Sequence, residues 1–467
     1  MNFDYARATA LEIAAAVSSQ RITARAVTEA ALARIAATHP RINAFTSVTA
    51  GRARSEAAAV DASIATGRDP GPLAGVPYAV KNLFDLAGTV TVAGSKIHRE
   101  NPPANEDATA VERLRRAGAV CLGALNMGEY AYDFVTENAH DGATRNPHDL
   151  SRSAGGSSGG SGAAIAAGLV PLTLGTDTNG SIRVPSSFCG IWGLKPTYSR
   201  LSRAGGVLFV ESLDHIGPLA RSVADLAAAY DVMQGPDPRD PVCTTRAVEL
   251  STPSVDLGLN GLRVAVLGGY FSKGGHPNAH AAVARVAATL NVVRQIELPT
   301  PALARAAAYT ITATEGGHRH LSRLKTRAAD FDPGTRDRFL AGALMPSGWY
   351  LHAQKFRAIW RDQLREIFRD VDVLLAPATP VSATLLGQQT MTLDGVEMLV
   401  RPNLGLFTQP ITFAGLPVVA APVHTPGAMP IAVQLIGAPW KEIDVLRVAR
   451  VLEKSGVCTA PVAALAA

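Results

Sequence analysis

Residues 155–197, GGSSGGSGAAIAAGLVPLTLGTDTNGSIRVPSSFCGIWGLKPT, contain the pattern that decides the fold. By composition alone, the Gly- and Ser-rich residues 151–162 are typical of a flexible linker. The flanking residues argue against a linker, because Ala163–Ala167 form a good helix start and residues 170–174 form an apolar run. We therefore expect this segment to be embedded in a helix-and-strand unit of the core.

The rest of the chain alternates between the same two patterns. Apolar residues at helical spacing predict helices, and short apolar runs predict strands. Helices are expected over 107–117, 160–168 and 222–233, and strands over 119–122, 170–174 and 263–267. A Pro-bounded apolar run, 72–81, is predicted to be a buried strand that ends in Lys81. This alternation predicts an α/β fold with a mixed or parallel sheet.

Both ends of the chain extend this fold. Residues 5–37 predict two amphipathic helices joined near residues 19–23, and we expect the N-terminal helical region, to about residue 60, to pack outside the core. Residues 303–366 are predicted to be mainly helical, and strands are expected at 371–376, 417–421 and 430–436. Pro-rich interruptions within 234–260 mark a soft boundary only.

Composition places the chain among globular proteins, with 47% hydrophobic and 18% charged residues. The net charge is +5, but Lys and Arg are scattered without a basic run, so we expect no nucleic-acid partner. No apolar stretch reaches the roughly 18 residues of a membrane span, and a basic segment followed by an apolar one does not open the chain. We therefore expect a cytoplasmic protein that does not bind a membrane.

Metal binding is not indicated by the cysteines or histidines. The four cysteines lie far apart without metal-type spacing. Neither the pair His276 and His280 nor the pair His318 and His320 has the H-E-x-x-H arrangement of zinc hydrolases. We expect no metal and no other cofactor.

Two serine-bearing segments, Gly155–Gly160 and Gly175–Pro185, lie one helix-plus-strand unit apart. Both can therefore reach one end of the sheet. Gly and Asn tolerate positive φ, and a run of such residues can point successive N–H groups into one concavity. An oxyanion hole is built in this way.

Residues 155–197 resemble the amidase signature family over their whole length. The similarity extends to Leu73–Asn82, Leu125–Tyr130, Ser212–Pro218 and Gly415–Val418, and so covers nearly the whole chain. The resemblance implies a single α/β/α domain, residues 1–467, with a mixed central sheet covered by helices. It also implies an amidohydrolase that cleaves a C–N amide bond.

Position by position, the resemblance makes Ser181 the nucleophile, Ser157 a bridging serine in a cis peptide, and Lys81 the base. A serine hydroxyl becomes a good nucleophile when a neighbour takes its proton, and a lysine can take it only if burial lowers the lysine pKa. The apolar strand around Lys81 meets this need. Ser157 would relay the proton between the other two and then help to protonate the departing amine.

The loop before the nucleophile is implied to form the oxyanion hole. Its backbone N–H donors would be those of Thr178, Asn179, Gly180 and Ser181. Many family members have Gly where this chain has Asn179, and we expect the Asn side chain to alter the pocket without breaking the loop. Asp is commoner in the family at the position of Asn82. We expect this difference to have little effect on the catalytic triad of Ser181, Ser157 and Lys81. Asp177 and Arg183 are expected to pair and to brace the loop.

Longer stretches resemble one subgroup of the family. They are VKNLFD (80–85), GTDTNGSIRVPSSFCG (175–190), LSR (201–203), SLDHIGPLA (212–220), TEGGH (314–318), APATPVSA (376–383) and MPIAVQLIGAPW (429–440). This resemblance implies deamination of 1-carboxybiuret, with release of ammonia, in cyanuric acid breakdown. It also implies a small accessory subunit in a heterotetramer, and a homodimer contact is expected through the N-terminal helices.

A carboxylated, urea-type substrate calls for an Arg fork and several hydrogen bonds to amide groups. Arg357 is the first candidate, because it resembles the position at which the glutamine-hydrolysing chains of transfer-RNA amidotransferases hold the α-carboxylate of glutamine. Further candidates lie in the segments that distinguish the subgroup: Tyr309, Glu315, His318 and His215. Core or supporting roles fit these residues equally well.

Other functions stay open beside this hypothesis. The chain could be an amidase for another small or aryl amide, or the amidotransferase chain that releases ammonia from glutamine. Ser157 and Ser158 also satisfy the G-x-S-x-G pattern of α/β-hydrolases, and Asp372 and His424 follow in the right order. The second serine motif and Lys81 disfavour that alternative. A non-catalytic binding protein is disfavoured because all three triad residues are present.

Overall fold

A computed structural model describes residues 3–465, so residues 1–2 and 466–467 of the expected domain lie outside the described range. The α-helices are α1 (Ala10–Ser18), α2 (Ala24–Ile42), α3 (Ala50–Ala65), α4 (Thr109–Arg116), α5 (Gly159–Ala166), α6 (Arg183–Cys189), α7 (Val223–Met233), α8 (Pro277–Thr289), α9 (Pro301–Arg327), α10 (Pro333–Ala343), α11 (Ser347–Ile367), α12 (Val400–Asn403), α13 (Gln409–Ala414) and α14 (Glu442–Lys454). The short 3-10 helices are η1 (Lys96–Glu100), η2 (Glu129–Ala131), η3 (Gly269–Ser272) and η4 (Ala328–Asp330).

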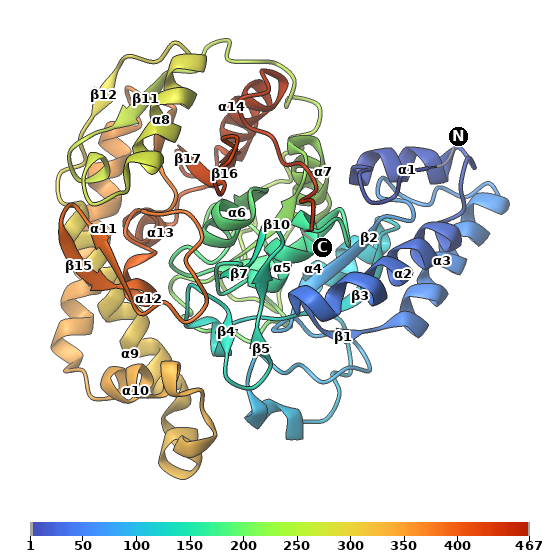
Figure 1. The fold of residues 1–467 in the computed structure, drawn as a ribbon, viewed down its shortest axis with the longest axis horizontal. Helices are drawn as coiled ribbons and strands as arrows, with labels where there is room; N and C mark the ends of the chain where they lie inside the picture. Colours follow the sequence, from blue (N-terminus) through green and yellow to red (C-terminus); the bar gives the residue numbers. More distant parts are fainter. Residues whose placement is uncertain (1–2, 466–467) are drawn as a thin grey trace.

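The strands are β1 (Phe45–Val48), β2 (Pro77–Lys81), β3 (Val120–Leu125), β4 (Glu137–Asn138), β5 (Gly142–Ala143), β6 (Arg145–Asn146), β7 (Asp149–Ser153), β8 (Leu172–Asp177), β9 (Trp192–Lys195), β10 (His215–Ala220), β11 (Val264–Leu267), β12 (Gln295–Ile296), β13 (Val373–Pro377), β14 (Thr390–Leu393), β15 (Val396–Leu399), β16 (Val418–Val423) and β17 (Ile431–Gly437). Eleven of them form one sheet in the order β1-β3-β2-β8-β10-β9-β16-β17-β13-β11-β12 (Figure 1).

The sheet is mixed, as the alternating sequence pattern predicts. β2 pairs in parallel with both β3 and β8, and β11 pairs in parallel with both β12 and β13. The remaining neighbours are antiparallel. The carboxyl ends of β2, β3 and β8 therefore meet at one edge of the sheet.

Helices cover both faces of the sheet. Every residue of β2, β3, β8, β10, β16 and β17 is buried. Successive side chains of a strand point to opposite faces, so burial of every residue requires cover on both. The covering helices include α5 on β8, α6 on β9 and β16, α7 on β10, α8 on β13 and α14 on β17. This is the expected α/β/α arrangement.

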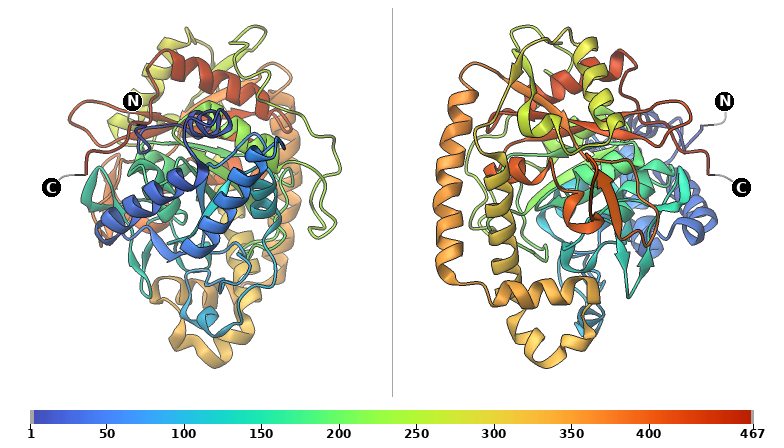
Figure 2. Two further views of the ribbon diagram at one scale, coloured as in Figure 1. Left: turned by 90° about the vertical axis from the view of Figure 1, so that its right-hand side faces the viewer. Right: turned by 60° about the vertical axis from the view of Figure 1, so that its left-hand side comes forward.

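The remaining helices gather at opposite ends of the molecule. The helices α1–α3 lie at one end, where α2 and α3 contact each other and the strands β2 and β3 (Figure 1). At the other end α9 and α11 run side by side, with α10 packed on α9 (Figure 2). The site described below lies between the central sheet and this second group.

The Gly- and Ser-rich segment is part of the core, because all residues of α5 are buried. Its small side chains let the helix approach its neighbours closely. A Cβ atom at Gly160 would lie 2.5 Å from the Asn126 carbonyl oxygen. The Ser161 hydroxyl donates to the Leu174 carbonyl of β8 at 3.0 Å, so the polar side chains are also satisfied. The expectation of an embedded unit in place of a linker is confirmed.

Candidate active site

Three parallel strands bring the sequence-predicted residues to one edge of the sheet. Lys81 is the last residue of β2, and residues 126–138 follow β3. The loop 178–181 follows β8. Lys81, the turn after β3 and the loop 178–181 therefore lie at the same end of the sheet.

Lys81 is completely buried. Its Nζ atom lies 2.7 Å from Ser157 Oγ and 2.8 Å from Thr176 Oγ1. Burial lowers the pKa of Lys81 from 10.5 to about 7, although the nearby carboxyl groups, Asp214 first, act in the opposite direction. A substantial fraction of the amine is therefore neutral near physiological pH, as a base requires.

Ser157 stands between Lys81 and the start of α5. It is completely buried, and the peptide bond between Gly156 and Ser157 is cis. The carbonyl oxygen of Ser157 accepts a hydrogen bond from the Gly128 N–H at 3.2 Å. The hydroxyl of Ser157 is thus held at the Lys81 amine by the backbone on both sides.

Ser181 follows a loop that is fixed on every side. The Thr178 hydroxyl donates to Asp214 Oδ1 at 2.5 Å, and the Thr408 hydroxyl donates to the Asn179 carbonyl at 2.6 Å. Gly180 has φ +146°, and a Cβ atom there would lie 2.4 Å from Thr408 Oγ1, so only glycine fits. These contacts hold the backbone of the loop in place.

The Asn179 side chain also joins this loop to α9. Its Nδ2 atom donates to Thr312 Oγ1 at 2.9 Å. Its Oδ1 atom is buried and has no hydrogen-bond partner among the described residues. Asn179 thus places a polar side chain in the loop that carries Ser181.

Asp177 and Arg183 form a buried ion pair behind the loop. Arg183 Nε and one terminal nitrogen each donate to the Asp177 carboxylate at 2.9 Å, and both side chains are fully buried. Burial alone would raise the pKa of Asp177, but the Arg183 guanidinium holds it well below its ordinary value. Arg183 also donates to Gln434 Oε1 at 2.6 Å. The expected brace of the loop is present.

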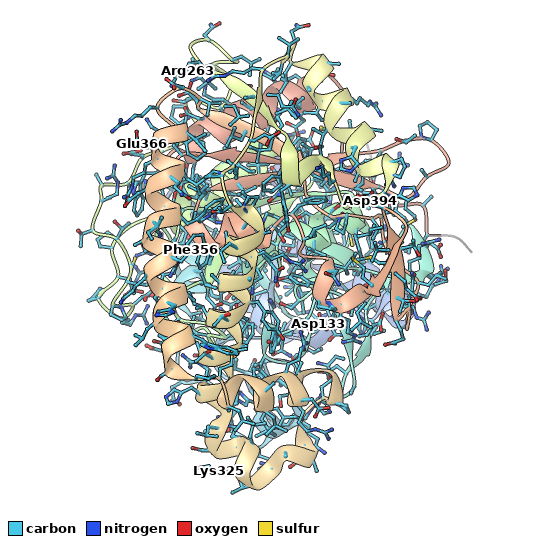
Figure 3. All side chains as sticks on the ribbon, turned by 90° about the vertical axis from the view of Figure 1, so that its left-hand side faces the viewer. Asp133, Arg263, Lys325, Phe356, Glu366 and Asp394 are labelled. Carbon is cyan, nitrogen blue, oxygen red and sulfur yellow. The ribbon has the colours of Figure 1, made fainter. Side chains whose placement is uncertain are left out.

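Ser181 lines a small cavity of about 30 Å³. Its lining is drawn from segments far apart in the sequence: Ala131, Tyr132, Asp133, Phe134, Thr178, Asn179, Ser181, Phe209, Tyr309, Thr312, Arg338, Arg401, Pro402 and Gln409. Figure 3 shows Asp133 toward the middle of the molecule, away from Phe356 of α11. The cavity is therefore enclosed by the turn after β3, the serine loop and the helices α9, α10, α12 and α13.

Comparison with known proteins shows the family of the chain. The Amidase family matches residues 26–446. The chain belongs to the amidase signature family. It is an enzyme that hydrolyses amides.

Two of the similar proteins align with almost the whole length of this amidase. AtzE of Pseudomonas sp. (strain ADP), which is part of 1-carboxybiuret hydrolase, is 56% identical over 450 residues, which are 96% of this chain and 98% of that protein. The A chain of the glutamyl-tRNA(Gln) amidotransferase of Roseiflexus sp. (strain RS-1) is 40% identical over 455 residues, 91% and 92% of the two chains.

A solved structure, described as an inhibitor-bound vestigial protein complex that reveals the origins of an s-triazine catabolic enzyme, has a TM-score of 0.96 to this amidase. The two chains are 55% identical, and the match covers 97% of this chain and 100% of the other. The similarity therefore reaches the cavity as well as the sheet.

Of the five predicted substrate-binding residues, the structure places one at the cavity. Tyr309 of α9 belongs to the lining, and 40% of its surface is exposed. The other four are not among the lining residues, and they lie in two different surroundings.

Arg357 and His215 are buried and occupied by the protein itself. Arg357 donates to the carbonyl oxygens of Phe413 at 2.8 Å and of Ser212 at 2.6 Å. Burial lowers its pKa to about 10. His215 Nδ1 lies 2.5 Å from the Leu213 carbonyl oxygen, and burial holds the His215 pKa well below its ordinary value. Both residues stabilise the backbone around the site.

Glu315 and His318 line a separate cavity together with Glu211, Arg319 and Tyr350. The Glu315 carboxylate accepts hydrogen bonds from the Ser212 backbone N–H at 3.1 Å and from the Tyr350 hydroxyl at 3.0 Å. The geometry thus ties Glu315 to the segment that precedes β10.

Three charged lining residues were missed by sequence reasoning: Asp133, Arg338 and Arg401. Asp133 follows the family-like stretch 125–130 and β3, whose carboxyl end meets that of β2. This shared sheet edge is the signal that could have identified Asp133. Arg338 and Arg401 lie on α10 and α12, and their sequence surroundings resemble ordinary charged surfaces.

The residues of the α/β-hydrolase alternative are engaged elsewhere. Asp372 forms an ion pair with Arg263 at 3.0 Å, and a His424 ring nitrogen lies 3.1 Å from the Gly190 carbonyl oxygen. Within residues 3–465, no three His, Cys, Asp or Glu side chains are grouped so as to hold a metal ion. None of the helices in that range combines the length and the apolar character of a membrane span.

Proposed function

We propose that this amidase hydrolyses 1-carboxybiuret and releases ammonia, with Ser181 as nucleophile, Ser157 as bridge and Lys81 as base. The choice of substrate rests on the 56% identity, over 96% of the chain, to a protein named for that reaction. The observation that supports the base is the 2.7 Å contact between Lys81 Nζ and Ser157 Oγ.

The proposed reaction begins with proton transfer. Ser181 passes its proton to Ser157, which passes its own to the neutral Lys81 amine, and Ser181 Oγ bonds to the amide carbonyl carbon. The backbone N–H groups of residues 178–181 hold the oxygen on which negative charge develops, and each donor in such a site contributes roughly 3 kcal/mol.

The proton then returns through Ser157 to the departing nitrogen, and the C–N bond breaks to give ammonia and an acyl-enzyme. Water attacks this carbamate ester with the same groups acting as base, which frees Ser181 and the N-carboxylated product. The net reaction consumes one water molecule for each ammonia released.

A heterotetrameric assembly with a small accessory subunit belongs to this proposal, as does a cytoplasmic location. The accessory subunit is supported by the similar solved structure, which is described as a protein complex. Copurification of the tagged chain from its native host, followed by light scattering, measures whether a small partner and two copies of each chain are present.

The test of the substrate is ammonia release by purified protein from four compounds: freshly generated 1-carboxybiuret, biuret, glutamine and an aryl amide. We expect selective turnover of 1-carboxybiuret, and none by Ser181→Ala. Activity on the aryl amide alone would discard the substrate and retain the amidase. Activity on glutamine alone would instead favour the amidotransferase function, to which the 40% identity points more weakly.

A further inference from the structure

A second cavity, of about 240 Å³, lies at the same edge of the sheet as the Ser181 loop, on the far side of β10. Because β9, β16 and β17 are antiparallel neighbours, β9 ends, β16 begins and β17 ends at this edge. The helix α11 forms a further wall, with the stretch between the labelled Phe356 and Glu366 (Figure 3). The described residues that line this cavity all differ from those that line the Ser181 cavity.

Arg361 of α11 brings an unpaired guanidinium to this cavity. Its Nε atom donates to the Ala414 carbonyl at 3.2 Å, whereas its two terminal nitrogens have no hydrogen-bond acceptor among residues 3–465. No carboxylate in that range lies within the 4.0 Å of an ion pair with Arg361. Arg365, one turn further along, also lines the cavity and pairs with Asp362. The cavity therefore carries one positive charge that the protein does not balance.

Two aromatic rings and a glycine shape the space around this charge. Tyr198 and Trp440 line the cavity from the ends of β9 and β17. The backbone of Trp440 has φ +68°, and its N–H group donates to Thr197 Oγ1 at 2.8 Å. At Gly415, which has φ +79°, a Cβ atom would lie 2.9 Å from Tyr198 Cβ and 3.7 Å from a terminal nitrogen of Arg361. Glycine thus keeps the space between the ring and the guanidinium free.

These groups select a ligand by charge and by shape. A guanidinium with two free terminal nitrogens matches a carboxylate, which it binds through parallel hydrogen bonds. Aromatic side chains favour a flat ring, through offset stacking or edge contacts. A cavity of roughly 150 Å³ already holds a benzene ring. The larger volume at Arg361 therefore has room for a ring that carries a carboxylate.

We propose that the cavity lined by Tyr198, Arg361 and Trp440 is a second binding site, for a small planar carboxylate such as an aromatic acid. Arg361 binds the carboxylate, and the two aromatic side chains contact the ring. The site goes beyond the proposed function, and it does not depend on which amide is hydrolysed at Ser181.

Isothermal titration calorimetry tests the ligand class. The protein is used as purified, with any subunit that copurifies, and is titrated with benzoate, benzyl alcohol and inorganic phosphate. Benzyl alcohol keeps the ring without the charge, and phosphate keeps the charge without the ring. We expect saturable binding of benzoate with a Kd of roughly 1 mM or below, and at least about tenfold weaker binding of the other two compounds.

The matched pair of variants is Arg361→Met and Arg369→Met, which each remove one positive charge and keep a long side chain. Arg369 is exposed, pairs with Glu366 at 2.7 Å and does not line the cavity. We expect Arg361→Met to weaken benzoate binding at least about tenfold, because a charge-assisted hydrogen bond is lost, and Arg369→Met to leave it unchanged. Arg361→Gln is the second variant if Arg361→Met does not fold, as judged by circular dichroism.

A crystal soaked in benzoate locates the ligand. We expect its carboxylate at hydrogen-bond distance from the terminal nitrogens of Arg361 and its ring beside Trp440. Three outcomes overturn the site: no saturable binding below about 20 mM, equal binding by wild type and Arg361→Met, or benzoate in the Ser181 cavity only. Phosphate or benzyl alcohol that binds as tightly as benzoate would overturn the ligand class.

Discussion

At the scale of single residues, the proposed mechanism depends on the protonation of one amine. Lys81, the last residue of β2, is buried, and its amine lies at hydrogen-bond distance from the hydroxyl groups of Ser157 and Thr176. Burial outweighs the attraction of the nearby carboxylates, and the pKa falls to about 7. An amine with this pKa exchanges protons with a serine hydroxyl at neutral pH far more readily than an exposed lysine.

The pH dependence of catalysis follows from this value. The pKa of Lys81 in the folded protein, about 7, is below its ordinary value, so the reactive neutral form is lost as the pH falls through 7. We expect kcat/KM to drop about tenfold per pH unit below that point and to level off above it. A kcat/KM profile that is flat from about pH 5 to about pH 9 would exclude Lys81 as the base. Lys81→Arg, which stays charged throughout, should be inactive at every pH.

At the scale of elements, the turn from β8 to α6 carries Ser181, the proposed nucleophile. Its geometry depends on Asp177, the last residue of β8, and on Arg183, the first residue of α6. Opposite Asp177 in the sheet, His215 opens β10 and lies 3.0 Å from the Asp177 carbonyl oxygen. The ends of two strands and one helix are therefore joined directly below residues 178–181.

Breaking the buried pair should destabilise the whole protein. Arg183→Met leaves the Asp177 carboxylate buried without its partner, and we expect the free energy of unfolding to fall by about 3–5 kcal/mol. Equilibrium urea denaturation, followed by circular dichroism, measures the change. Arg365→Met is the control, because Arg365 pairs with Asp362 on the exposed side of α11 and should leave the stability nearly unchanged. Equal stability of the two variants would mean that Asp177 does not need Arg183.

At the scale of the whole molecule, the site draws on residues from Lys81 to Gln409. The cavity lining extends from Ala131 to Gln409, and Lys81 stands behind it. One sheet connects these segments, with α1–α3 at one end and α9–α11 at the other (Figures 1 and 2). Loss of α9 and α10, which carry Tyr309, Thr312 and Arg338 of the lining, should therefore remove activity.

A single domain over the whole chain stays a prediction, and unfolding tests it. If the chain is one cooperative unit, amidase activity and helical circular dichroism should be lost at the same urea concentration. An activity midpoint well below a second, separate loss of secondary structure would indicate two units. The soft boundary at residues 234–260 is where such a division would fall.

Much of this fold could be predicted because its signals are local. The apolar runs that became β2, β3 and β8, and the helical spacing that became α4, α5 and α7, are strong within single segments. β10 was missed because its strand contains a histidine and a proline, residues that are uncommon in strands. β9, from Trp192 to Lys195, is too short to show a periodicity.

The site residues also differ in whether a local sequence signal could predict them. Lys81, Ser157 and Ser181 were predicted from contiguous motifs, whereas Arg338 and Arg401 reach the cavity through the packing of α10 and α12. Nothing in the pattern Arg336-Asp337-Arg338 distinguishes a guanidinium at a cavity from one in solvent. Arg357 illustrates the converse, since its position resembles a substrate anchor while its donors serve the backbone.

Covalent labelling of the nucleophile tests the catalytic assignment most directly. The protein is treated with a fluorophosphonate, which modifies activated serine hydroxyls, and the modified peptide is identified by mass spectrometry. We predict one adduct, on Ser181, that is absent from Ser181→Ala and forms far more slowly in Lys81→Met. An adduct on Ser157 or Ser158, or undiminished labelling of Lys81→Met, would contradict the triad.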